Sequence, residues 1–156
     1  MSSHSRNQVL CTYLKANKYG SYSFLYNSTS SARGVGIIYS DSLKLNVHDV
    51  YRDPNENYIL INSTLNNQKV TIGSVYLPSK ASEEEITLFT EKIDKFENNI
   101  KIIGGDFNMT PSPSPPLHNP DVFNHTGCNM RGSKIIEDWM EANNLIEPFR
   151  LLYPNK

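Results

Sequence analysis

Asp106 and Asn108 are the residues of this chain whose types and spacing best support chemistry. They end the stretch Ile100–Asn108, with the sequence IKIIGGDFN, in which an apolar β-branched run is followed by a pair of glycines. The run predicts a buried strand, and the glycine pair allows a turn or a close approach of the backbone. In an extended backbone, residues i and i+2 face the same way, so Asp106 and Asn108 are expected to point together and Phe107 away from them. A carboxylate and an amide on one face can take a proton and hold a polar substrate oxygen.

The alternative for this stretch is an ordinary turn, because Gly, Asp and Asn are all common turn residues. Tyr76 is a further candidate, since the segment Val75–Pro78 (VYLP) places a tyrosine just before the end of another strand. If the two strands lie near each other in one sheet, Tyr76, Asp106 and Asn108 converge at its edge. Taken alone, a tyrosine at a strand end is more often a packing residue than a functional one.

Composition sets broad limits on the fold and on the partners. The chain has 156 residues, of which 38% are hydrophobic and 20% charged, and a net charge of −1, which is typical of a globular chain with material for one core. This net charge does not indicate a nucleic-acid-binding protein, because such domains are usually strongly basic. A local basic strip or a bound metal can nevertheless attract the phosphates of nucleic acid. Cys11 and Cys128 lie far apart without zinc-type neighbours and are expected to be free thiols. The polar N-terminus lacks the apolar segment of a signal peptide, so an intracellular location, nuclear or cytoplasmic, is expected.

The pattern of apolar residues predicts a strand-rich chain with three helices. Strands are expected at Ser21–Asn27, Gly34–Ser40, Leu43–Val47, Tyr58–Leu65, Lys69–Leu77 and Ile100–Gly105. Helices are expected at Arg6–Asn17, Ser82–Asn98 and Ser133–Asn143. The clearest local signals are a capping box at the start of the second helix, Ser82 with Glu85, and a two-residue hairpin loop at Asn66 and Asn67.

The order of these elements predicts the fold class. Strands joined by hairpins, with few helices between them, favour an α+β layered sandwich over a doubly wound parallel sheet, which needs a helix after nearly every strand. No internal repeat or linker divides the chain, so residues 1–156 are expected to form one domain. The number of expected strands without partners indicates that the sandwich is incomplete.

In order and spacing, several segments resemble the endonuclease/exonuclease/phosphatase family, which has the deoxyribonuclease I-like fold. The matching segments are Arg33–Tyr39 (RGVGIIY), Val75–Pro78 (VYLP), Gly105–Asn108 (GDFN), Arg131–Met140 (RGSKIIEDWM) and Leu145–Pro154 (LIEPFRLLYP). The last two are similar to the endonuclease domains of LINE-type, non-LTR retrotransposons. There the family has D-x-W-R, whereas this chain has Glu147 to Arg150 (EPFR).

The resemblance implies hydrolysis of a phosphodiester, with DNA as the partner and a divalent metal, magnesium, as the cofactor. Asp106 matches the aspartate that handles the proton of the attacking water or the leaving oxygen. Asn108 matches an amide that holds the phosphate, and Tyr76 matches a tyrosine whose hydroxyl contacts it. Such groups are needed because the pentavalent phosphorus centre develops negative charge that fixed donors and metal must meet. In the full-length protein, a reverse transcriptase domain is a further expected partner.

Two parts of the family pattern are absent from the chain. The family's Glu-Thr-His-Ser stretch best matches Ser2 to Ser5, so the metal-binding glutamate falls on Ser2, and the terminal Ser-Asp-His motif would lie beyond Lys156. The chain is therefore expected to be a domain truncated at both ends, with its metal ligands unknown. Two hypotheses follow: a magnesium-dependent endonuclease that nicks DNA, and a truncated or decayed member that at most binds nucleic acid weakly. A phosphatase on inositol phosphates or a sphingomyelin hydrolase is the third.

Overall fold

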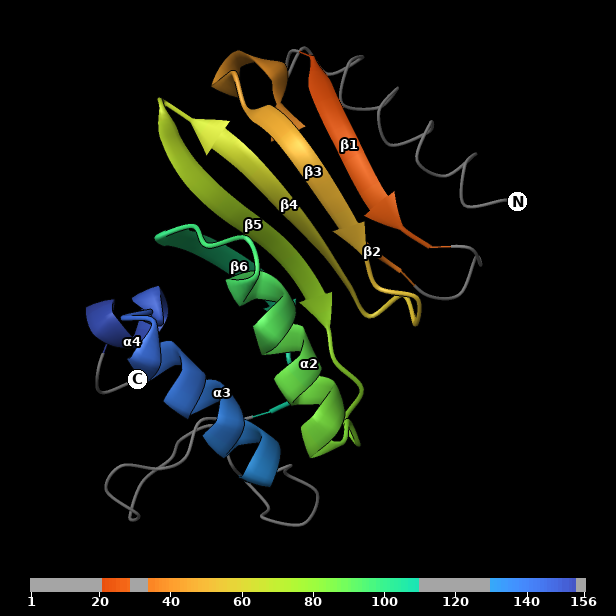
Figure 1. Ribbon diagram of the computed structural model, residues 1–156, viewed down its shortest axis with the longest axis vertical. Helices are drawn as coiled ribbons and strands as arrows, with labels where there is room; N and C mark the ends of the chain where they lie inside the picture. The colour runs from red at the N-terminus through yellow and green to blue at the C-terminus, as the bar shows by residue number, and fades with distance from the viewer. Residues whose placement is uncertain (1–20, 29–33, 110–129, 154–156) are drawn as a thin grey trace. The chain divides into compact units, whose positions relative to one another are not determined.

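The computed structural model describes residues 21–28, 34–109 and 130–153. The described residues form two compact units by their contacts: residues 21–76 with 96–106, and residues 77–95 with 107–153. The first unit holds all the described strands and the second holds the α-helices (Figure 1). The expected helix Arg6–Asn17, both cysteines and the proline-rich segment after Thr110 lie outside the described residues.

The first unit is built of two β-sheets. A two-stranded antiparallel sheet contains β1 (Tyr22–Asn27) and β2 (Val35–Ser40). A four-stranded mixed sheet has the order β3-β4-β5-β6. Its strands are β3 (Asn46–Arg52), β4 (Tyr58–Leu65), β5 (Gln68–Tyr76) and β6 (Ile100–Asp106), and they lie side by side in Figure 1. The first three pair antiparallel, whereas β6 runs parallel to β5.

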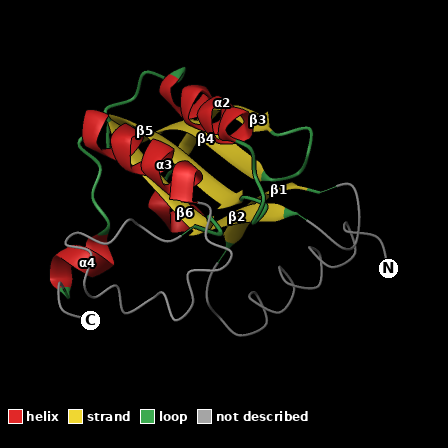
Figure 2. Ribbon diagram, turned by 90° about the horizontal axis from the view of Figure 1, so that it is seen from below, coloured by secondary structure: helices red, strands yellow, loops and turns green. Residues whose placement is uncertain are grey.

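The two sheets face each other to form the sandwich core. β2 contacts β4 and β5, and β1 contacts β4 (Figure 2). In the large sheet, Ile59, Ile61 and Val70 are buried, and the alternation along β4 and its register with β5 place them on one face. This arrangement confirms the predicted α+β layered sandwich.

The β4–β5 hairpin follows its sequence closely. Asn66 and Asn67 take φ angles of 49° and 64°, as a two-residue type I′ loop requires. Asparagine tolerates this conformation better than most residues, so the loop fixes the register of β4 against β5.

The second unit contains α2 (Glu83–Asp94), α3 (Met130–Ala142) and the short α4 (Pro148–Leu152). The capping box is confirmed: the Ser82 hydroxyl accepts from the Glu85 amide, and the Glu85 carboxylate accepts from the Ser82 amide at 2.7 Å. Helices α2 and α3 pack against each other, with Phe89 of α2 lying 6.5 Å from the ring of Trp139. None of the described helices is long and apolar enough to cross a membrane.

Several predicted elements are corrected. Leu43 does not begin a strand: Asp41–Leu43 form a 3-10 helix, η1, in which the Ser42 amide donates to the Ser40 hydroxyl. Such local hydrogen bonds compete with strand pairing, and Lys44 then takes a φ of 52°, so β3 starts only at Asn46. The second helix ends at Asp94 rather than Asn98, because Glu97 adopts a positive φ of 53°.

The strands predicted as buried at Gly34–Ser40 and Ile100–Gly105 are exposed on one side. Ile38 in β2 is 40% exposed, and Ile102 in β6 is 53% exposed. The physical reason for β6 is its position at the edge of the described sheet, where it pairs with β5 on one side only. A short apolar run therefore identified a strand but not its burial.

Candidate active site

Tyr76 and Asp106 are brought together by the parallel pairing of β5 and β6. They occupy directly opposite register positions at the carboxyl ends of the two strands. Paired residues on neighbouring strands turn their side chains to the same face of the sheet. Tyr76 is 50% exposed and Asp106 is exposed, so solvent reaches both side chains. The two strand ends are therefore neighbours in one sheet, as the sequence analysis expected.

Gly105 fixes the backbone directly before Asp106. Its φ is +143°, and a Cβ at this position would lie 2.0 Å from the Val75 carbonyl oxygen. A residue other than glycine cannot enter this conformation without moving β6 away from β5. Of the two roles expected for the glycine pair, a turn or a close approach of the backbone, Gly105 has the second: it lies within β6 and allows the close approach that places Asp106 opposite Tyr76.

The backbone of Tyr76 is held on its other side by the turn between β3 and β4. The Tyr76 amide donates to the carbonyl oxygen of Asn57, the residue directly before β4, at 2.7 Å. The Asn57 amide in turn donates to the buried carboxylate of Asp53 at 3.0 Å. In sequence, Asp53 to Asn57 (DPNEN) indicates only a turn around Pro54. An aspartate that begins a turn is a signal for such a side chain to backbone hydrogen bond.

Asn108 belongs to the second unit. Its side-chain amide donates to the Leu77 carbonyl oxygen at 2.8 Å, and its φ is 50°. The expectation that residues 106 and 108 face the same way assumed extended backbone, and the left-handed conformation at Asn108 removes that assumption. Its neighbour Phe107 packs edge-on against Phe89, with ring centroids 6.2 Å apart. The convergence of Asn108 with Tyr76 and Asp106 stays a prediction.

The described residues do not by themselves form a metal centre. Among residues 21–28, 34–109 and 130–153, no group of three or more His, Cys, Asp or Glu side chains is placed to hold an ion. Of the three candidate residues, Asp106 alone carries a carboxylate, the oxygen ligand that Mg²⁺ favours. Ser2, which matches the family's metal-binding glutamate, lies outside the described residues. By side-chain type, the Asp106 carboxylate can transfer a proton, and the Tyr76 hydroxyl and the Asn108 amide can donate hydrogen bonds.

Comparisons with known proteins support the fold. No protein-family model matches the chain. No curated protein is similar to it in sequence. Among solved structures, the chain is similar to the endonuclease domain of TRAS1, a telomere-specific non-LTR retrotransposon, with a TM-score of 0.50 and 13% identity. The similarity covers 78% of this chain and 52% of that one.

A second similar structure is D. rerio TDP2 complexed with single-strand DNA product. Its TM-score is 0.47 and its identity 19%, over 65% of this chain and 44% of that one. The chain thus spans about half the length of the solved structures it matches, or less. The described residues have the deoxyribonuclease I-like fold that the sequence resemblance implied.

Proposed function

We propose that this chain is part of a phosphodiesterase that nicks DNA, with Tyr76 and Asp106 in its active site. The observation that carries the proposal is the pairing of these two residues at the carboxyl ends of β5 and β6. Neighbouring strands lie about 4.8 Å apart, so a single phosphate group can contact a side chain from each. Both side chains are open to solvent, which a polymeric substrate requires.

In this proposal Asp106 acts as the proton-transfer group. A carboxylate accepts the proton of an attacking water, or returns it to the leaving oxygen, when it lies within hydrogen-bond reach. Tyr76 donates its hydroxyl to a phosphate oxygen and stabilises the negative charge that develops on the pentavalent phosphorus. Asn108 holds the phosphate through its side chain. A divalent cation, magnesium first, supplies further charge stabilisation when bound.

The proposal extends to the kind of protein. The Leu145–Pro154 segment resembles the tail of non-LTR retrotransposon endonucleases, and the fold is shared with the TRAS1 domain. A reverse transcriptase domain encoded in the same reading frame is the corresponding partner. Reading the coding sequence on both sides of this segment tests that part directly: an unrelated frame on both sides contradicts the retrotransposon origin.

The experiment for the activity is a plasmid-nicking assay in Mg²⁺ and in EDTA. It compares the unaltered chain with Asp106→Asn, which removes the charge at constant size, and with Asp49→Asn, the same change at an exposed aspartate of β3. We expect nicking in Mg²⁺, a loss of about 10²- to 10⁴-fold in Asp106→Asn, and an unchanged rate in Asp49→Asn.

Two results contradict the proposal. Nicking that survives Asp106→Asn removes this residue from the chemistry. A chain that binds DNA but nicks in no divalent cation supports instead the alternative of a decayed member that binds without cleaving. Fluorescence anisotropy with labelled DNA, run on the same samples, distinguishes that outcome from a chain that does not bind at all.

A further inference from the structure

We infer that Asn27 and Asp53 are positioning residues for Tyr76, acting through the turn between β3 and β4. The catalytic consequence of this role rests on the proposed function, but the positioning itself is a property of the first unit. All the residues in the chain of contacts, from β1 through the turn to the end of β5, belong to that unit.

Asn27 is the last residue of β1 and joins the small sheet to the turn. It is 7% exposed, and its side-chain amide donates to two backbone carbonyl oxygens, that of Asp53 at 2.7 Å and that of Tyr58 at 3.0 Å. These two carbonyls flank the turn, at the end of β3 and the start of β4. A single buried side chain thus fixes both ends of the turn.

Asp53 organises the turn from inside. It is 5% exposed, its amide donates to the Tyr58 carbonyl at 3.1 Å, and its carbonyl accepts from Glu56 at 3.0 Å. Its carboxylate accepts from the Asn57 amide at 3.0 Å. Burying a carboxylate is costly unless it is hydrogen-bonded, so a neutral turn residue would be the cheaper way to make an ordinary hairpin loop.

The turn is connected to Tyr76 by a backbone hydrogen bond. The carbonyl of Asn57, whose amide Asp53 holds, accepts from the Tyr76 amide at 2.7 Å. This bond extends the β4–β5 ladder by one residue, to the position that faces Asp106 across the parallel pair. The backbone of Tyr76 is therefore fixed between Asn57 on one side and β6 on the other. Without the turn, Tyr76 would be the frayed end of a strand, and its side chain would no longer start from a fixed backbone.

The chain offers a matched control at the opposite end of the same sheet. Asn98 is 2% exposed, and its side-chain amide also makes two hydrogen bonds, to the Asn62 side-chain oxygen at 2.9 Å and the Thr71 hydroxyl at 3.1 Å. Thr71 precedes Tyr76 by five residues in β5, about 16 Å along the strand. Asn27→Ala and Asn98→Ala each remove one buried amide with two donated bonds. The first lies at the turn that holds Tyr76, and the second lies at Thr71, in the first half of β5.

The experiment measures hydrogen exchange of the Tyr76 and Thr71 backbone amides by NMR in the full chain and in both variants. We expect Asn27→Ala to reduce the protection of the Tyr76 amide by about tenfold, the equivalent of one hydrogen bond, and to leave that of Thr71 unchanged. Asn98→Ala should do the reverse. Equal loss at both amides in both variants, or no loss at Tyr76 in Asn27→Ala, overturns the inference.

The hydrogen bond from the Asn57 amide to the Asp53 side chain is tested by two variants, one that keeps the side-chain acceptor oxygen and one that removes it. Asp53→Asn keeps a side-chain oxygen for the Asn57 amide and should retain Tyr76 protection, whereas Asp53→Ala should lose it. This pair also decides the inference if Asn27→Ala does not fold. Loss of protection in Asp53→Asn equal to that in Asp53→Ala contradicts it.

Nicking kinetics separate the inference from the proposed function. If the unaltered chain nicks DNA, Asn27→Ala should lower kcat with little change in KM, whereas Asn98→Ala should leave both unchanged. A kcat unaffected by Asn27→Ala overturns the catalytic role of this positioning. If the unaltered chain does not nick, the proposed function fails, and the exchange measurement still decides whether Asn27 and Asp53 fix Tyr76.

Discussion

Tyr76 and Asp106 lie directly opposite each other at the ends of two parallel strands, although 29 residues separate them along the chain (106 minus 76, less one). The intervening chain includes α2, which belongs to the other compact unit. The pairing therefore depends on the long-range contact between β5 and β6, and neither strand alone creates it. Both residues of the pair belong to the first unit.

Replacing Tyr76 by Phe removes the hydroxyl and keeps the ring. Because the side chain is half exposed, the change should not affect stability, whereas the loss of one donor to the transition state should lower the nicking rate by about 10²-fold. The same substitution at Tyr22, at the far end of β1, is the control and should leave the rate unchanged. Equal rates for Tyr76→Phe and the unaltered chain would remove the hydroxyl from the mechanism.

Gly105→Ala should destabilise the first unit strongly. A Cβ at this position meets the Val75 carbonyl oxygen at 2.0 Å, and φ is +143°, so we expect a loss of about 3 kcal/mol or more in the free energy of unfolding. Gly104→Ala is the matched control, because a Cβ there has open space around it. Urea denaturation of both variants measures the difference. Similar midpoints for the two would show that β6 can move away from β5 at little cost.

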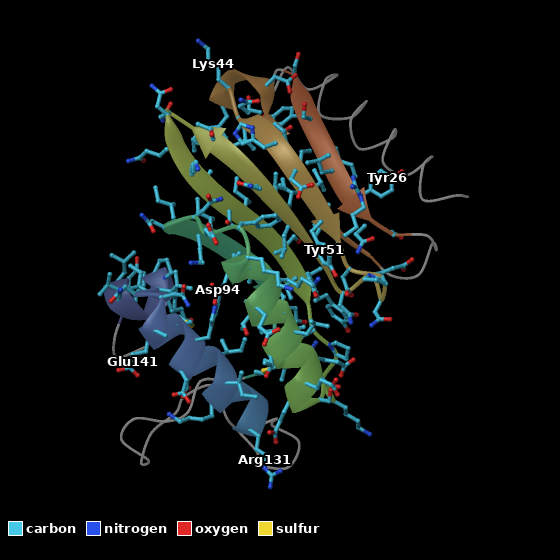
Figure 3. The ribbon with its side chains drawn as sticks, viewed as in Figure 1. Tyr26, Lys44, Tyr51, Asp94, Arg131 and Glu141 are labelled. Carbon is cyan, nitrogen blue, oxygen red and sulfur yellow. The ribbon has the colours of Figure 1, made fainter. Side chains whose placement is uncertain are left out.

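Asp94→Ala should loosen the packing of α2 on α3. The Trp139 ring nitrogen donates to the Asp94 carboxylate at 3.0 Å, and Asp94 lies between the two helices (Figure 3). Losing this charge-assisted bond should cost about 1–3 kcal/mol. Trp139 is the only tryptophan of the chain, so its fluorescence reports the change directly as a red shift.

The control for Asp94 is Asp138→Ala, which removes an exposed carboxylate paired with Lys134 on the surface of α3 at 2.6 Å. Surface pairs of this kind contribute little, so no shift in the tryptophan emission or in the unfolding midpoint is expected. A larger effect at Asp138 than at Asp94 would contradict the assignment of the structural role to Asp94.

Tyr58 should make the stability of the first unit depend on alkaline pH. Burial raises the pKa of the Tyr58 hydroxyl well above its usual range, and the nearby charge of Asp53 raises it further. The unfolded chain then loses this proton first, near pH 10, so stability is complete below that pH and falls as the pH rises above it.

Urea unfolding at a series of pH values between 8 and 11 measures this effect against the variant Tyr58→Phe. The other titrating groups are common to both proteins, so the difference in slope isolates Tyr58. The unaltered chain should lose stability more steeply above about pH 10. Parallel curves for the two proteins would show that the Tyr58 hydroxyl titrates alike in the folded and unfolded chain.

Much of the local structure could be predicted because the relevant hydrogen bonds join residues close in sequence. The Ser82 capping box and the loop at Asn66 and Asn67 are of this kind, and both are confirmed. The wrong start of the third strand has a different origin: alternating apolar residues were taken as evidence that the segment pairs with a neighbouring strand. Leu43 lies in a 3-10 helix, since Ser40 and Lys44 make local contacts that no hydrophobic pattern shows.

The sequence by itself determined the strand and turn chemistry of this protein and the residue types of its candidate site. Asp106 follows a glycine pair, and Tyr76 lies two residues before Pro78. Glycine and proline are local signals that a strand ends, so the sequence alone predicts that both residues lie at strand ends. Tertiary structure alone decided that β6 is a parallel strand at the edge of the described sheet, that Ile102 is exposed, and that Tyr76 pairs with Asp106. The physical reason is that the order and register of strands distant in sequence depend on which faces bury each other, and periodicity along one strand carries no information about its neighbour.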